Sequence, residues 1–168
     1  MLIVAEKTLF VSSEVSLFDK LVSAGEEKAH ITLPHQIRIF LVLYLTEHLC
    51  DTSIIHNVLA LGLLNSPQRF GEFGNVELRR TGDAALLLAG FYPEWAHRLN
   101  VSPDYFRFMG QSAYASLAAR LHATGKTERG RFYDEVAVRL RSLETVLYAA
   151  REREDLRDFF LRLKARYQ

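Results

Sequence analysis

The sequence predicts an all-α protein, a single-domain helical bundle of about six helices, with a short N-terminal strand or irregular segment as the alternative at the start. Apolar residues recur at helical spacing along most of the chain, and the four prolines and nine glycines fall where such helices would stop. A chain of 168 residues, 49% of them hydrophobic, is able to enclose one core. No linker or internal repeat interrupts it, so residues 1–168 are expected to form one domain.

The N-terminal segment is ambiguous between strand and helix. Residues 2–4 and 9–11 are compatible with short strands or with a helical turn. Ser12 or Ser13 then offers an N-cap, and a first helix is expected to stop near Gly25.

The second expected helix has the broadest apolar surface of the chain. Thr32 is its expected N-cap, and Pro34 fits the first turn, where a missing N–H costs nothing. Apolar residues between positions 37 and 45 then cover nearly every side of the helix. A helix of this kind is central in a protein or lies at a subunit interface, so the pattern favours a homodimer as one option.

The middle of the chain predicts two helices separated by a loop. Residues 54–64 form a short apolar stretch, and the next helix begins near Asn75. Its uncharged run at 84–90 predicts a buried helix. Because Pro93 disfavours the α conformation of the residue before it, we expect a break between Gly90 and Pro93.

A short helix and a longer one are expected after this break. Pro93 opens the short helix, and Ser102 is the expected N-cap of the longer one, which closes at Gly125. Two amphipathic helices then complete the bundle. Their apolar stripes are Tyr133, Val136, Leu140, Leu143, Leu147 and Ala150 in the first, and Leu156, Phe159, Phe160, Leu163 and Tyr167 in the second.

Composition limits the classes of function. The net charge of +1 does not favour binding to nucleic acid, and the mildly basic last third is interleaved with acids. No secretory signal is visible, and the longest apolar run, at 39–45, is far shorter than the roughly 20 residues that span a bilayer. We therefore expect a soluble cytoplasmic protein with no membrane partner, in which the single cysteine, Cys50, is structural.

The segment from position 78 to 114 resembles a family of uncharacterised bacterial all-helical proteins. It carries a Gly-Asp before a buried helix, a Gly-Phe-x-Pro turn, an Asp-Tyr pair and a Gly-x-x-Ala-Tyr helix. Phe106 stands where the family usually has a second tyrosine after Tyr105. The resemblance implies a bacterial helical protein, and no activity comes with it.

Asp83 is the most informative candidate for a site, because it directly precedes the apolar run. In one interpretation it faces a pocket and binds a ligand or a proton. In the other it pairs with Arg79 at i,i+4 or with Arg80 at i,i+3, which is the interpretation we favour. Gly82 before it lowers helix stability by about 1 kcal/mol relative to alanine, which suggests a close backbone approach.

Two further groups of residues are candidates. Glu94 and His97 have the Glu-x-x-His spacing of di-metal helical bundles, and Glu27 and His30 repeat it. Such a site also needs two more carboxylates, for which Glu47 and Glu144 are the candidates. An aromatic group is expected to pack at helix crossings or to line a ligand pocket. It includes Phe91, Tyr92, Trp95, Tyr105 and Tyr114.

No nucleophile elbow and no glycine-rich phosphate loop is present in the sequence, so the identity of any cofactor stays unknown. The first hypothesis is a non-catalytic regulatory or protein-interaction module that binds a protein partner or itself. The alternative is a ligand-binding or metal-dependent enzyme that uses Asp83, Glu94 and His97. Nucleic-acid binding is the weakest of the three.

Overall fold

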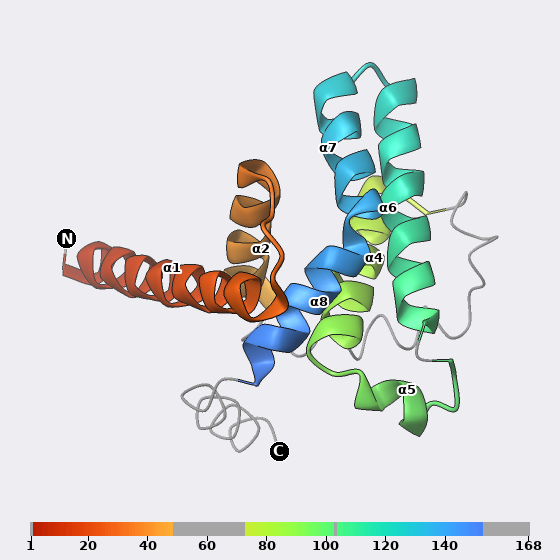
Figure 1. Cartoon of the computed structure of the whole chain (residues 1–168). Helices are drawn as coiled ribbons and strands as arrows, with labels where there is room; N and C mark the ends of the chain where they lie inside the picture. Colours follow the sequence, from red (N-terminus) through yellow and green to blue (C-terminus); the bar gives the residue numbers. More distant parts are fainter. Residues whose placement is uncertain (1, 49–72, 103, 153–168) are drawn as a thin grey trace. The chain divides into compact units, whose positions relative to one another are not determined.

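The fold is all-α, as the sequence predicts. The computed structural model describes residues 2–48, 73–102 and 104–152, and side chains from residue 14 onward within these ranges. These ranges contain seven helices and no strand (Figure 1). By its internal contacts the chain divides into two compact units, the first made of Met1–Asp51 and Thr145–Gln168 and the second of Thr52–Glu144. Whether they act as one domain stays a prediction.

Two helices follow each other directly in the N-terminal segment of the first unit, α1 (Leu2–Ala29) and α2 (His35–His48). The alternative of an N-terminal strand or irregular segment is wrong, because α1 is helical from Leu2 onward. The expected stop at Gly25 is also wrong. A Cβ at Gly25 would collide with the carbonyl oxygen of Val146, so this glycine allows a close approach inside a helix instead of ending one.

Helix α1 ends with a left-handed residue that is not glycine. His30 has a φ of 54°, and the amide of Ile31 donates to the carbonyl of Glu26 at 3.0 Å while the amide of His30 donates to Glu27 at 3.3 Å. This pair of bonds is the Schellman arrangement, which usually places glycine at the left-handed position.

The second unit begins with α4 (Asn75–Gly90), α5 (Glu94–Arg98) and α6 (Tyr105–Ala123). The predicted start near Asn75, the break before Pro93 and the buried run after Asp83 are confirmed. The prediction that Ser102 is the N-cap of α6 is wrong, because the helix begins at Tyr105 and Asp104 is at the cap position. The hydroxyl of Ser102 instead accepts a bond from the amide of Asp104 at 3.3 Å.

The last described helices are α7 (Thr127–Val138) and α8 (Leu140–Arg151). The prediction of one continuous amphipathic helix from Tyr133 to Ala150 is wrong. The backbone of Arg139 departs from helical geometry, with a ψ of 6°, and separates α7 from α8. The apolar stripe nevertheless continues across the interruption. Before α7, Gly125 has a φ of +77° and closes α6 as predicted.

Helices α4, α6 and α7 pack closely through small residues. A Cβ at Gly110 of α6 would lie 3.4 Å from the Cβ of Ala85 on α4, and one at Gly130 of α7 would lie 2.7 Å from the ring of His122 on α6. Figure 1 shows α6 antiparallel to α7, with a turn joining them. The core they share is apolar apart from Thr81 and Asp83.

Some predictions concern residues outside the described part of the chain. The helix expected at 54–64, the second amphipathic stripe after Leu156 and Cys50 all lie there. Within the described residues, no helix combines the length and the apolar character needed to cross a membrane.

Candidate functional site

The best-defined polar site of the described residues is a buried carboxylate between α4 and α6. Asp83 is 2% exposed, and the hydroxyl of Tyr114 donates to its Oδ1 at 2.6 Å. Tyr114 is itself fully buried. A hydrogen bond to a charged group inside a core is worth about 1.5–3 kcal/mol, so this bond offsets part of the cost of burying the carboxylate.

Gly82 makes room for the tyrosine that reaches Asp83. A Cβ at Gly82 would lie 2.7–2.9 Å from three ring carbons of Tyr114, closer than real Cβ atoms come. The close approach expected at Gly82 is therefore confirmed, and the group that approaches is an aromatic ring.

Arg79 supplies a positive charge at the edge of the site. Its Nε lies 3.5 Å from Oδ2 of Asp83, which confirms the i,i+4 pair that the spacing favours. The side chain of Arg79 is 44% exposed while that of Asp83 is 3% exposed, so the ion pair extends from the protein surface into the core. Its contribution to stability is reduced by solvent screening on the arginine side.

Tyr133 of α7 extends the site to a third helix. Its ring stacks on Tyr114 with a centroid separation of 6.0 Å and an interplanar angle of 17°. Burial raises the pKa of the Tyr133 phenol, and the charge of Asp83 acts in the same direction. Arg79 and Arg129 act against this rise.

Sequence reasoning identified only part of this group. It singled out Asp83, Arg79 and Tyr114, but it treated Tyr133 as one member of an apolar stripe and did not consider Arg129. A tyrosine in a stripe otherwise made of aliphatic residues is the signal that was available, because a buried phenol usually has a polar partner.

Two of the other aromatic candidates, Tyr105 and Trp95, lie elsewhere in the second unit. Tyr105 begins α6, nine residues and thus about 14 Å along the helix before Tyr114. It contacts Phe106 edge to face at 5.6 Å. Trp95 lies on α5, where the guanidinium of Arg98 is 5.3 Å from its ring. A ligand role for Asp83, Tyr105, Tyr114 and Trp95 stays a prediction.

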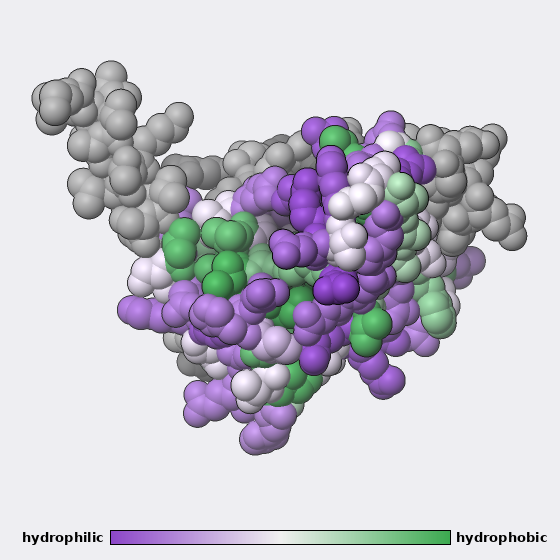
Figure 2. All heavy atoms as spheres, turned by 90° about the horizontal axis from the view of Figure 1, so that it is seen from above, coloured by the Kyte–Doolittle hydropathy of each residue, from purple (hydrophilic) through white to green (hydrophobic). Residues whose placement is uncertain are grey.

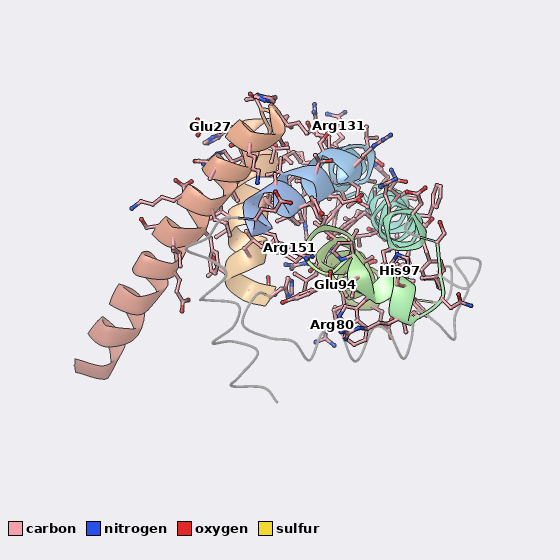
Figure 3. All side chains as sticks on the ribbon, turned by 60° about the horizontal axis from the view of Figure 1, so that its bottom comes forward. Glu27, Arg80, Glu94, His97, Arg131 and Arg151 are labelled. Carbon is pink, nitrogen blue, oxygen red and sulfur yellow. The ribbon has the colours of Figure 1, made fainter. Side chains whose placement is uncertain are left out.

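The metal candidates lie on one short helix. Glu94 and His97 both come from α5 (Figure 3), with Glu94 half-buried and His97 exposed. Across the described ranges, no group of three or more His, Cys, Asp or Glu side chains is arranged to hold a metal ion. A metal at Glu94 and His97 therefore has no third ligand among these residues.

The additional carboxylates considered for that site have other surroundings. Glu144 accepts two bonds from Arg107, at 2.6 and 2.9 Å, and this pairing raises the pKa of Arg107. Glu27 lies inside α1, and His30 follows the end of that helix. The repeated Glu-x-x-His spacing thus does not lie within one helix.

The α1–α2 hairpin has a polar clamp on one side. Arg38 donates to Oε2 of Glu26 at 3.0 Å, to Oδ1 of Asp19 at 2.7 Å and to the hydroxyl of Ser23. The other oxygen of Glu26 accepts the amide of Leu33 at 2.8 Å. One arginine of α2 therefore fixes the end of α1 and the connecting loop.

The outward side of α2 is apolar. Ile39 is 45% exposed and Leu43 is 54% exposed, one turn apart on the same face. Ile37, Leu41 and Leu45 are buried on the opposite side. The apolar residues that cover nearly every side of this helix in the sequence thus form two stripes, one buried and one exposed.

Comparison with known proteins adds no assignment. The sequence matches no protein-family model, and neither the curated proteins nor the solved structures contain a significant match. The resemblance to an uncharacterised bacterial family therefore stays a prediction, and function has to be argued from the geometry alone.

Proposed function

We propose that the protein is a non-catalytic interaction module that self-associates through the outward face of α2. The observation that carries this proposal is the exposure of two large aliphatic side chains, Ile39 and Leu43, on one face of a well-formed helix. Most of the surface seen in Figure 2 is hydrophilic, with apolar side chains in a few small patches. Apolar surface of this kind is typical of contact sites when it follows one helix face.

The spacing along this face supports a helix–helix contact. Gln36, Ile39, Leu43 and Thr46 are separated by three, four and three residues, which is the spacing of the a and d positions in a coiled coil. Three of them are exposed and Thr46 is half-buried. A second copy of α2 is the occupant with the same spacing and the same length.

The pair is proposed to be antiparallel, because the dipoles of the two helices then run in opposite directions. In the register centred at the level of Leu41, Ile39 of one copy faces Leu43 of the second copy.

The proposal is tested by light scattering over a wide concentration range. One short helix per copy offers little of the roughly 1,600 Å² that stable complexes bury, so the dimer is expected to dissociate on dilution. The mass should rise from 19.2 kDa toward about twice that value as concentration increases. A mass that stays at 19.2 kDa at millimolar concentration would contradict self-association.

Matched variants assign the contact to α2. Replacing Ile39 and Leu43 together by Glu should keep the protein monomeric, because it places four carboxylates in the seam of a dimer. Leu17→Glu is the control, since Leu17 is 40% exposed on α1 of the same unit. If Leu17→Glu abolished the dimer equally, the contact would not be specific to the face of α2.

We do not extend the proposal to catalysis by Asp83, Glu94 and His97. The carboxylate of Asp83 lies 2.6 Å from the Tyr114 hydroxyl and 3.5 Å from Arg79, so both its oxygens are engaged by protein groups. Such a carboxylate stabilises the packing of α4 against α6, which is sufficient to account for its burial.

A further inference from the structure

Tyr114 is a buried phenol whose proton has a defined acceptor. Its side chain is fully buried, and its hydroxyl donates to Oδ1 of Asp83 at 2.6 Å. This separation lies within the range of roughly 2.6–3.2 Å in which a positioned carboxylate is able to take a proton from its partner. The bond that stabilises the packing of α4 against α6 is therefore also a direct path for one proton.

Such an acceptor decides whether a buried tyrosine is able to lose an electron. A phenol that has lost one electron is a very strong acid, and an unpaired charge in an apolar core is costly. Oxidation in the core therefore needs a group that takes the proton in the same step. With the proton on Oδ1 of Asp83, the phenoxyl radical of Tyr114 and the carboxylic acid are both neutral. Arg79 keeps its charge at the surface, because its side chain is 44% exposed.

Tyr133 connects Tyr114 to the edge of the second unit. Its ring is stacked on that of Tyr114, with a centroid separation of 6.0 Å and an interplanar angle of 17°. Tyr133 is 6% exposed, whereas Tyr114 is not exposed at all. Because the two π-systems are stacked, an electron from Tyr114 has an aromatic route through Tyr133 toward solvent.

The position of the Tyr114 ring is fixed by its surroundings on α4. A Cβ at Gly82 would lie 2.7–2.9 Å from three of its ring carbons, so the ring fills the space that a side chain would take. The ring therefore stays close to both Asp83 and Tyr133, and water has no room beside it.

We propose that Tyr114 is a redox-active tyrosine, which gives one electron through Tyr133 to a one-electron oxidant of the radical class and gives its proton to Asp83. The O–H bond of Tyr114 breaks, an O–H bond forms on Oδ1 of Asp83, and the electron reduces the oxidant. A one-electron donor reverses the step, and the proton then returns to Tyr114. Because water is excluded, the radical outlives radicals on exposed tyrosines. This activity is independent of self-association through α2.

The experiment is flash oxidation of the full chain with photogenerated ruthenium(III) tris-bipyridine, followed by electron paramagnetic resonance. In the wild type, the tyrosyl radical should decay about tenfold or more slowly than the radicals formed in Tyr114→Phe. Tyr148→Phe, at a tyrosine that is 46% exposed, is the matched control and should leave the slow decay within about twofold of the wild type. The circular dichroism spectrum of Tyr114→Phe is recorded first, because this variant also loses the bond to Asp83.

A second measurement needs no variant. A soluble nickel(II) chelate speeds the relaxation of radicals that it is able to approach. It should raise the microwave power at half saturation for radicals on exposed tyrosines and leave that of the slowly decaying radical unchanged. Tyr133→Phe should lower the yield of this radical, because phenylalanine does not relay the electron.

Three results would overturn the proposal. The first is equal radical decay in the wild type and in folded Tyr114→Phe. The second is a wild-type radical that the nickel chelate relaxes as strongly as one on an exposed tyrosine. The third is an unchanged radical yield in Tyr133→Phe, which would exclude the route through the stacked ring.

Discussion

The α1–α2 hairpin and the α4–α6–α7 group use polar residues in opposite ways. In the hairpin, the polar clamp around Arg38 lies at the edge of the two helices, and the outward face of α2 is apolar. In the second unit, Asp83 and Tyr114 are in the core, and the partly exposed Arg79 lies at the edge of the site. In the hairpin, an apolar surface is therefore exposed to a partner, whereas in the second unit the exposed part of the site is charged.

This difference predicts different sensitivities to substitution. A buried polar bond is costly to break because the remaining group stays without water, while an edge clamp can be replaced in part by solvent. Removing one hydrogen-bonding group should therefore cost more in the second unit than in the first.

The largest effect is expected for Tyr114→Phe. It removes the hydroxyl that donates to Asp83 and should lower the free energy of unfolding by about 1.5–3 kcal/mol. Denaturation in urea measures this loss. Tyr148→Phe, at an exposed tyrosine, is the control and should change stability by less than about 0.5 kcal/mol. A loss for Tyr114→Phe as small as that of the control would contradict a buried charge held by this bond.

A smaller effect is expected from opening the clamp of the hairpin. Glu26→Ala removes the acceptor of both Arg38 and the Leu33 amide and should cost about 1 kcal/mol, since the group is partly screened by water. Glu27→Ala is the matched control, because the neighbouring Glu27 is exposed. The comparison between the two units would be reversed if Glu26→Ala cost more than Tyr114→Phe.

The end of α1 gives an expected gain in stability. His30 has a left-handed conformation that is unfavourable for side chains with a Cβ, and glycine adopts it at no steric cost. His30→Gly should raise the free energy of unfolding by about 0.5–1 kcal/mol, and thermal denaturation would show it as a higher Tm. A lower Tm would mean that the imidazole makes a contact that outweighs the backbone strain.

The smallest effect is one of pH and appears only in alkaline solution. Because burial raises the pKa of Tyr133 in the folded state above 10.0, the unfolded chain loses this proton first as pH rises. The stability that the protonated Tyr133 phenol contributes to the folded state is complete below pH 10. It is lost as the pH rises through the pKa of this phenol in the folded state. Tyr133→Phe should therefore show a shallower fall in stability above pH 10 than the wild type, and identical slopes would contradict the burial of the phenol.

The elements that could be predicted from the sequence are those set by local chemistry. The uncharged run before Gly90 predicted a buried helix, and Pro93 predicted its end. The pair of Arg79 and Asp83 followed from i,i+4 spacing. Each of these depends on residues within about one or two turns of one another.

The features that could not be predicted depend on distant residues. Gly25 looked like a helix end, but it allows Val146 to approach from more than a hundred residues away. The partner of Asp83 is Tyr114, on another helix, and Tyr133 joins them from a third. The interruption at Arg139 has no proline or glycine to mark it. Periodicity identifies the buried face of a helix but not the helix that covers it.

The most direct test of the account is a distance measurement between two copies of α2. A spin label is placed at position 43 or, separately, at position 47, in a Cys50→Ser background at a concentration where the dimer forms. In an antiparallel pair centred on Leu41, the labels are offset along the helix axis by roughly 6 Å at position 43 and roughly 18 Å at position 47. We predict a clearly shorter distance at 43 than at 47. Equal distances at the two positions, or no coupling between copies, would contradict the proposed contact.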